Sequence, residues 1–361
     1  MANSMRWVGL DVHALETQAA VLDQVTGELS YRKIRGRPGV VIEWLETIPR
    51  PFRAVYEAGP TGYGLARRAA ERRLAVSVCA PGHILRRAQD RIKTDKRDAA
   101  KLARLLLAGE LRPVRVPDPE EEQLRDLVRA REDVRVDLMR ARHRLSKLLL
   151  RRELYYPGSG NAWTGRHREW LDSLRFADQA SQVVFSDYLE AQDLLLTRRD
   201  RLERELEALA SESPWAPTIA NLRALRGIDT LSAIGLCAEI GEFGRFDPEQ
   251  LASYLGLVPS EKTTGEQRRQ GSITKAGSKH ARRLLVEAAW HYRHRPYVSE
   301  KLRRRQRRCD PRAVQIAWQA QRRLHGRWRH LARRRGKRET KVAVAVAREL
   351  SAFCWEVAIL N

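Results

Sequence analysis

The chain has 361 residues, which is enough for two or three domains with buried cores. Its 68 Lys and Arg against 45 Asp and Glu give a formal net charge of +23, which favours a polyanionic partner, most simply nucleic acid. An acidic membrane surface is the alternative partner, but the chain has no long uncharged apolar run and no signal-peptide pattern at its start. We therefore expect no membrane span. Four widely spaced cysteines, without metal-ligand spacing, predict reduced thiols in a cytoplasmic protein.

The first hundred residues predict an α/β domain. The apolar run "WVGLDVH" predicts a strand that carries Asp11, and "TQAAVLDQVTGELSYRKI" predicts two strands joined by a turn at Thr26 and Gly27. Residues 39–48 have the spacing of an amphipathic helix, and residues 53–59 read as a strand. A further helix, "TGYGLARRAAERR", and a further strand, "LAVSVCAP", follow. This alternation predicts a sheet covered by helices.

Four carboxylates are placed where such a sheet binds ligands. Asp11 and Glu57 lie at strand ends, and Asp95 and Asp98 lie one helical turn apart in "IKTDKRDAAKLARL". Their mutual repulsion requires an offsetting charge, either from neighbouring Lys and Arg side chains or from a divalent metal. Any one of these acids alone is more often a helix cap or a surface charge. Together, in this order, they predict a site for two Mg²⁺ ions, because hard cations prefer oxygen ligands.

The same residues carry a resemblance to a known family. Asp11 in "GLDVH", Glu57 in "VYEAGPTGYG", and Asp95 and Asp98 in "KTDKRDA" resemble the DEDD-type insertion-sequence transposases, which include Piv-like DNA invertases. The resemblance implies a RuvC-like (RNase H-like) nuclease domain in which these four residues bind Mg²⁺ at the catalytic centre. It also implies double-stranded DNA as the substrate. Because many members are guided by a bridge RNA, a non-coding guide RNA is an implied partner.

The middle of the chain predicts a helical hairpin with a coiled-coil-like stripe. From about Glu120, apolar residues recur at alternating steps of three and four, with Arg131 and Ala141 filling gaps. A second stripe runs from Tyr188 to Leu209, and the Gly/Pro-containing "YYPGSGNAWTGRHREWL" predicts the turn between them. Packing within one chain and dimerisation both fit this pattern. The family resemblance implies dimerisation, and we expect a homo-oligomer, either a dimer or a tetramer.

The C-terminal third predicts a mainly α domain that contacts nucleic acid. Gly227 separates two apolar helical segments, which fits a helix-hairpin-helix that holds a phosphate, although a plain helical hairpin has the same pattern. The following "SEKTTGEQRRQGSITKAG" predicts a basic loop that leads into a helix near Lys279. "GLVP" and "GSITKAG" again resemble the transposase domain of the same family. Between Arg293 and Lys341, 19 Lys and Arg face three acids, a net charge of +16 that favours contact with a nucleic-acid backbone.

The family carries a nucleophilic serine in this loop, and its place falls on Thr264 in "EKTTGE". A threonine hydroxyl can also act as a nucleophile, although branching at Cβ restricts its rotamers. We predict that Thr264 attacks DNA and forms a covalent link. Thr263, Ser260 and Ser272 are the alternatives, and a slow or inactive protein is another. A junction endonuclease that uses metal-activated water and a non-catalytic nucleic-acid binder are the rival functions.

These patterns together predict three domains. Residues 1–112 form the RuvC-like nuclease domain, residues 113–215 the helical linker, and residues 216–361 the transposase domain. In this interpretation the acidic site holds the scissile phosphate and a hydroxyl from the last domain attacks it.

Overall fold

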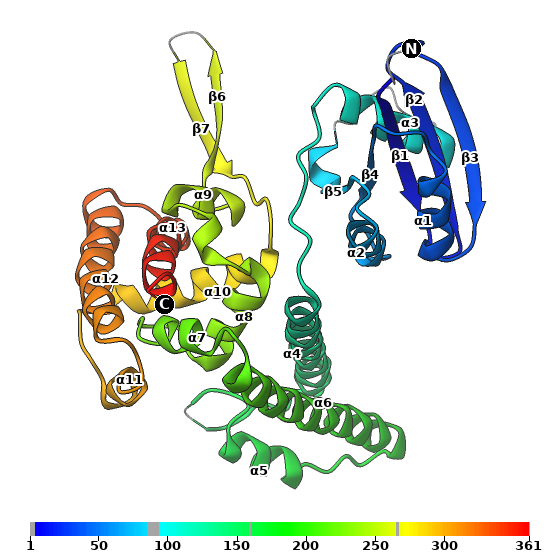
Figure 1. Cartoon of the computed structure of the whole chain (residues 1–361). Helices are drawn as coiled ribbons and strands as arrows, with labels where there is room; N and C mark the ends of the chain where they lie inside the picture. Colours follow the sequence, from blue (N-terminus) through cyan, green and yellow to red (C-terminus); the bar gives the residue numbers. More distant parts are fainter. Residues whose placement is uncertain (1–3, 85–93, 159, 265–266, 361) are drawn as a thin grey trace. The chain divides into compact units, whose positions relative to one another are not determined.

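The computed structural model describes residues 4–84, 94–158, 160–264 and 267–360 (Figure 1). The chain divides into two compact units, residues 1–118 and 119–361. An α/β beginning and a mainly helical remainder are confirmed, while the division into three domains stays a prediction. No helix in the described ranges is long and apolar enough to cross a membrane.

The first unit is built on a five-stranded sheet in the order β3-β2-β1-β4-β5. The first three strands are antiparallel, and β4 and β5 run parallel to β1. Gly27 has a φ of 69° in the predicted turn between β2 and β3, a backbone conformation that glycine adopts without strain. The strands are β1 (Arg6–Val12), β2 (Glu16–Asp23), β3 (Leu29–Arg35), β4 (Phe52–Glu57) and β5 (Val76–Cys79).

The two faces of the sheet are covered by different helices. Val8 and Leu10 of β1 belong to the core that α1 (Pro38–Glu46) and α2 (Gly64–Glu71) complete. Gly9 lies between them and faces α3 (Asp95–Leu107). A Cβ on Gly9 would lie 2.6 Å from the Ala103 amide nitrogen and 2.9 Å from the Leu102 Cβ. The missing side chain therefore lets α3 pack directly on the backbone of β1.

Gly9→Ala is expected to lower the free energy of unfolding of the first unit by about 1–3 kcal/mol, because the added methyl group overpacks the contact between β1 and α3. Thermal unfolding measures the effect. Gly64→Ala is the matched control, since a Cβ there meets nothing within 4 Å and the residue begins α2. Equal melting temperatures for the two variants would contradict this packing.

The second unit begins with two long helices, α4 (Pro119–Arg151) and α6 (Gln179–Glu212). Leu124 near the start of α4 shares a core with Leu206 near the end of α6, and Leu145 shares another with Phe185. The helices are therefore antiparallel, as the predicted hairpin requires. Arg131 lies in the apolar stripe and is paired there, since its Nε donates to Glu203 Oε1 at 2.9 Å. The coiled-coil character stays a prediction.

Two details of the predicted hairpin are wrong. The connection contains a third helix, α5 (Gly165–Ser173), where the sequence predicts only a turn. Thr164 caps this helix, and His167 and Trp170 pack their rings 5.4 Å apart, so aromatic packing stabilises a segment too short to show a clear helical period. Leu209, placed in the buried stripe, is exposed, whereas the adjacent Ala210 is buried.

The main core of the second unit is formed by α7, α8, α9, α10, α12 and α13 with residues of α4 and α6, and α13 packs against α7, α9, α10 and α12 (Figure 1). The predicted helix pair around Gly227 is confirmed as α7 with α8. The helices are α7 (Ala216–Leu222), α8 (Thr230–Ile240), α9 (Pro248–Tyr254), α10 (Lys279–Ala289), α11 (Glu300–Gln306), α12 (Pro311–Arg329) and α13 (Glu339–Ala358). Short 3₁₀ or π turns are η1 (Pro81–His83), η2 (Phe243–Arg245), η3 (Trp290–Arg293) and η4 (His330–Arg334).

The basic loop predicted before α10 is wrong, because the structure has a β-hairpin there. Strands β6 (Pro259–Thr264) and β7 (Gln267–Ile273) pair antiparallel, and the hairpin projects from the helices around it (Figure 1). The β-branched Thr263 and Thr264 favour extended backbone, but the many charged residues around them make the segment resemble a loop. The helix predicted near Lys279 is confirmed as α10.

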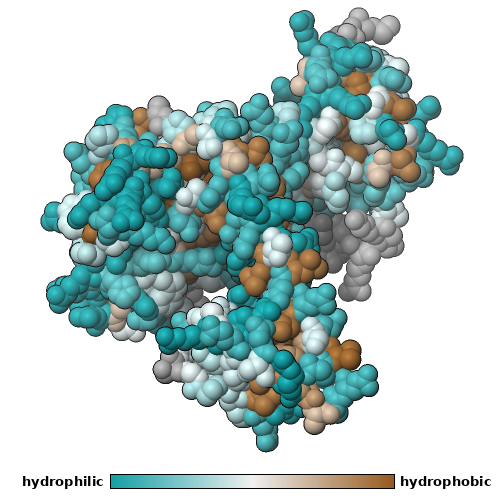
Figure 2. All heavy atoms as spheres, turned by 90° about the horizontal axis from the view of Figure 1, so that it is seen from below, coloured by the Kyte–Doolittle hydropathy of each residue, from teal (hydrophilic) through white to brown (hydrophobic). Residues whose placement is uncertain are grey.

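Hydrophilic side chains predominate on the face shown in Figure 2, with smaller hydrophobic areas between them. On the described helices α4 and α6, several large apolar side chains are exposed. Four of them form two pairs spaced by eleven residues, which is about three helical turns, so that the members of a pair share one face of their helix. The pairs are Met139 with Leu150 on α4 and Val183 with Leu194 on α6.

Candidate active site

Asp11 and Glu57 are neighbours at the ends of two parallel strands. The last paired residues of β1 and β4 are Leu10 and Tyr56, so Asp11 and Glu57 follow at the same level. Successive side chains alternate between the faces of a sheet, and adjacent strands lie about 4.8 Å apart. Because Gly9 and Val55 face α3, Asp11 and Glu57 extend from the sheet on that side too.

Helix α3 brings the second pair of acids to the same face. Thr94 caps the helix, since its hydroxyl accepts a hydrogen bond from the Arg97 amide at 3.4 Å. Asp95 and Asp98 occupy the first turn, where the helix dipole favours negative charge. Each lies four residues before a side chain that packs on the sheet, Ala99 and Leu102 respectively, so both acids share that side of the helix.

His13 joins this cluster and was not among the residues predicted from the sequence. Its Nε2 lies 3.4 Å from Asp11 Oδ2 and 3.9 Å from Asp95 Oδ1. The ligand atoms of Asp11, His13 and Asp95 all lie within 4.8 Å of one another, close enough to share one metal ion. The signal was present in the sequence, because His13 follows Asp11 by two residues and a strand returns to the same face every two residues.

The electrostatics of Asp11 indicate a place for a cation. Burial raises the pKa of the Asp11 carboxyl group, His13 lowers it, and the negative charges of Asp95 and Asp98 raise it, with a net upward shift. Negative charge is therefore crowded here, and a divalent ion would relieve the repulsion. Carboxylate oxygens are the ligands that hard divalent ions such as Mg²⁺ prefer, whereas imidazole suits transition-metal ions.

The predicted site residues thus divide into two groups. Asp11 and Asp95 converge with His13, Asp98 acts on Asp11 through its charge, and Glu57 lies beside Asp11 by strand register. In the second unit, Thr264 ends β6, and its backbone pairs with Gln267. The side chains of Thr263 and Thr264 lie outside the described part of the chain. Ser260 and Ser272 are exposed on the two strands of the hairpin.

Comparison with known proteins gives a consistent result over the whole chain. A transposase family model of the DEDD type of the IS110 group matches residues 8–153, and the transposase IS116/IS110/IS902 family model matches residues 219–303. The chain is 39% identical to "Putative transposase y4qE" of Sinorhizobium fredii, over 98% of this chain and 88% of the relative. It is 32% identical to the transposase for insertion sequence element IS1533 of Leptospira borgpetersenii, over 92% and 98% of the two chains.

The first model spans all four predicted acids, and the second spans α7 to α11. The resemblance seen in "GLDVH", "VYEAGPTGYG" and "KTDKRDA" is therefore confirmed. With full-length relatives above 30% identity, the chain belongs to the IS110 family of DEDD transposases and is a DNA transposase.

Proposed function

We propose that the protein cleaves and rejoins DNA strands at the ends of an insertion sequence through a metal-binding DEDD site in its first unit. The convergence of Asp11, His13 and Asp95 carries this proposal. The sheet order, with one acid at the end of β1 and another at the end of β4, supports the RuvC-like (RNase H-like) fold that the family implies. A DNA substrate also implies that the protein acts in the cytoplasm.

Asp11, Glu57, Asp95 and Asp98 would hold Mg²⁺ through their carboxylate oxygens. When bound, two such ions activate an attacking oxygen and stabilise a leaving one. His13 has a different role in this proposal, because Mg²⁺ prefers oxygen ligands to imidazole. Its Nε2 hydrogen-bonds Asp11 and fixes the orientation of that carboxylate.

Thr264 is the proposed nucleophile. A bond forms between its hydroxyl oxygen and the scissile phosphorus as the bond to the leaving deoxyribose oxygen breaks, and the proton of the hydroxyl passes to solvent or a nearby base. The place of Thr264 at the end of β6, on a hairpin that projects from the helical core, gives it access to a bulky substrate (Figure 1). Rejoining reverses the step with a new deoxyribose hydroxyl.

One observation favours a second candidate function. Threonine stands where the family carries serine, and an enzyme that uses metal-activated water needs no such hydroxyl. A structure-specific endonuclease of this kind would cut DNA with the same acids and leave no protein attached.

The proposed nucleic-acid partners are double-stranded DNA and a guide RNA. Helix α12 and its flanks carry most of the excess positive charge, and Arg322 and Arg329 are among its basic residues. Such a surface binds phosphates through Coulomb attraction and counterion release. Since charge alone does not distinguish DNA from RNA, the guide RNA rests on the family.

A homo-oligomer is proposed on the exposed apolar residues of the helical hairpin. Met139, Leu150, Val183 and Leu194 are between 43% and 61% exposed, and they repeat on fixed helix faces. Helices of a second copy would cover these side chains, as in other helix bundles.

Trapping of a covalent intermediate tests the reaction. Purified protein, Mg²⁺, a supercoiled plasmid with the element's ends, and the transcript of its flanking non-coding region are mixed and stopped with denaturant. Wild type is expected to give a protein–DNA adduct, and Thr264→Ala is expected to eliminate it, because the attacking oxygen is gone. Thr263→Ala, the matched control, is expected to retain it.

The other outcomes have distinct meanings. An adduct that survives Thr264→Ala would assign the attack to Thr263, Ser260 or Ser272. Cleavage without any adduct would favour the endonuclease that uses water. No cleavage and no adduct, with the transcript present, would contradict the proposed reaction and leave a nucleic-acid binder.

A further inference from the structure

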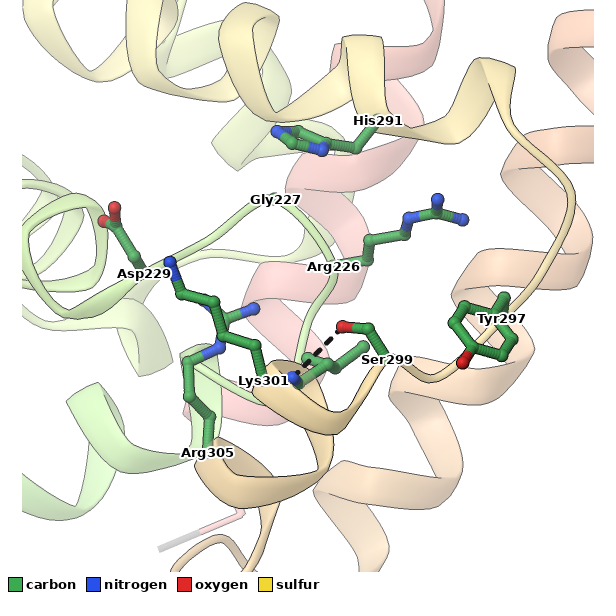
Figure 3. A pocket seen from close by; sticks show the side chains of 9 residues that line it. Arg226, Gly227, Asp229, His291, Tyr297, Ser299, Lys301 and Arg305 are labelled. Atoms are coloured by element: carbon green, nitrogen blue, oxygen red, sulfur yellow. Dashed lines mark hydrogen bonds between the residues drawn. The ribbon is translucent and has the colours of Figure 1, made fainter. Parts of the chain in front are cut away.

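A cavity of about 300 Å³ lies in the second unit between the α7–α8 turn, η3 and α11 (Figure 3). Arg226 and Gly227 come from the turn, His291 from η3, and Lys301 and Arg305 from α11. Lys301 and Arg305 are four residues apart, so they lie on one face of α11, and Figure 3 shows both side chains reaching toward the turn. The α7–α8 turn, which is distant in sequence from η3 and α11, thus contributes basic groups to the same cavity as these two elements.

The charge of this cavity is strongly positive. The acid that lines it, Asp229, already caps α8, because its carboxylate accepts a hydrogen bond from the Ser232 amide at 2.8 Å. Against it stand Arg226, Lys301 and Arg305, with His291 in addition when protonated. Arg226 donates to the Arg295 carbonyl oxygen at 2.9 Å, so the surplus in the cavity is one of positive charge, which an anion would neutralise.

Arg305 carries one of these positive charges. One of its terminal nitrogens donates to the Ile228 carbonyl oxygen at 2.6 Å, which holds the guanidinium at the cavity wall. Its Nε is buried and has no hydrogen-bond partner among the described atoms. A buried donor without a partner costs free energy, so a ligand that supplies an acceptor oxygen would be favoured.

The basic groups also act on one another. Burial lowers the pKa of His291, and the positive charges of Arg226, His294 and Arg305 lower it further. Burial likewise lowers the pKa of both Arg226 and Arg305. Cations held together in a partly water-excluded space repel each other, and an anion between them would remove this repulsion.

The backbone of the turn is fixed against the helices that form the cavity. Gly227 has a φ of 86°, and a Cβ on it would lie 2.7 Å from the Ala288 carbonyl oxygen and 2.9 Å from the His291 ring. Only glycine allows this approach without displacing α10 and η3. The position of the turn relative to His291 is therefore determined by backbone packing.

We propose that this cavity binds one phosphate group of a nucleic-acid backbone. The proposal rests on the nucleic-acid binding assigned above to the second unit and specifies one contact within it. A phosphodiester supplies anionic acceptor oxygens that neutralise the surplus positive charge, and a single contact of this kind fixes register without reading sequence. Lys301, exposed and free of structural hydrogen bonds in the described part of the chain, is the residue that binds the phosphate from the solvent side.

The salt dependence of binding tests this contact. Full-length protein is titrated with a fluorescent DNA duplex, and separately with a single-stranded RNA of equal length, at several salt concentrations. Lys301→Gln is expected to reduce the slope of log K against log salt by about 0.9 for the duplex, or about 0.7 for the single strand. Over a fourfold rise in salt, wild type then loses about 3.5-fold more duplex affinity than the variant.

Two control variants distinguish the loss of the phosphate contact in the cavity from the loss of one unit of net positive charge. Arg198→Gln removes the same charge from an exposed residue of α6, outside both the cavity lining and the basic region 293–341, and is expected to leave the slope unchanged. Lys301→Arg keeps the charge and is expected to keep the wild-type slope. The arm in which the slope changes identifies DNA or RNA as the source of the phosphate.

Equal slopes for wild type and Lys301→Gln in both arms would overturn the cavity contact while leaving nucleic-acid binding intact. An equal reduction by Arg198→Gln would also overturn it, because the effect would then belong to net charge. Failure of wild type to bind either nucleic acid would instead refute the proposed function on which the inference rests.

Discussion

Asp11→Asn is expected to lower the rate of Mg²⁺-dependent DNA cleavage by about a thousandfold. Metal ions contribute several kcal/mol of charge stabilisation to such reactions, and about 4 kcal/mol corresponds to three orders of magnitude in rate. Asp11 lies next to His13 and Asp95, and the negative charge of Asp98 raises its pKa. Asparagine keeps the shape of the side chain and removes the charge that a metal requires.

The measurement is single-turnover cleavage of the plasmid substrate with protein in excess. Glu46→Gln is the matched control. Glu46 is the last residue of α1 in the same unit, and its carboxylate forms an exposed ion pair with Arg72. Asp11→Asn is expected to remain folded, because the raised pKa of Asp11 means that its charged form is disfavoured in the native protein. Cleavage within about tenfold of wild type would contradict a metal-binding role for Asp11.

Glu239→Gln is expected to lower the free energy of unfolding of the second unit by about 1.5–3 kcal/mol, the usual contribution of hydrogen bonds to a charged group. Glu239 lies on α8 and is only 5% exposed. Its carboxylate accepts hydrogen bonds from Arg129 of α4 at 3.1 and 3.3 Å, and His280 of α10 lies 3.9 Å away. One carboxylate thus joins three helices, and its loss removes the contacts that connect α8 to Arg129 of α4 and His280 of α10.

Urea unfolding followed by tryptophan fluorescence measures this effect. Glu287→Gln is the control, because Glu287 is 58% exposed where it pairs with Arg283, and exposed pairs contribute less than about 1 kcal/mol. Equal losses of unfolding free energy in the two variants would show that the buried carboxylate of Glu239 stabilises the protein no more than an exposed one.

The buried carboxylate of Glu239 also predicts a dependence on pH. Burial raises the pKa of Glu239, but the hydrogen bonds from His280 and Arg129 and the charge of Arg129 lower it from 4.5 to about 2. A carboxyl group whose pKa falls on folding stabilises the native state above its unfolded pKa. The contribution of Glu239 is therefore complete above about pH 4.5 and is lost as the pH falls toward about 2, and Glu239→Gln should show no such loss.

The sequence predicted the first unit well because its signals are local. Apolar alternation marked each strand, and Asp11 and Glu57 stood at strand ends, where parallel neighbours bring them together. The helical spacing of Asp95 and Asp98 placed both on one face of α3. These parts depend on backbone periodicity, which can be read from a single chain.

The parts that were missed depend on contacts distant in sequence or on weak local signals. Helix α5 is held by the aromatic packing of His167 and Trp170, and the β6–β7 hairpin is concealed by its charged residues. His13 was missed because its spacing from Asp11 gave only half of the signal, and the other half, Asp95, reaches it from α3, which is distant in sequence. The cavity beside Lys301 combines α11 with the α7–α8 turn, and no spacing in the sequence predicts that meeting.

The contact between Gly9 and α3 restricts the spacing of the proposed catalytic acids in one direction only. The helix already rests on bare backbone, so no substitution at position 9 can bring Asp95 and Asp98 closer to Asp11 and Glu57, and every larger residue moves them apart. Mg²⁺ binds its oxygen ligands at 2.0–2.1 Å, whereas Ca²⁺ accepts 2.3–2.6 Å and a looser geometry. Substitutions at position 9 would therefore change the ion preference of the proposed site in one direction only, away from Mg²⁺ and toward Ca²⁺.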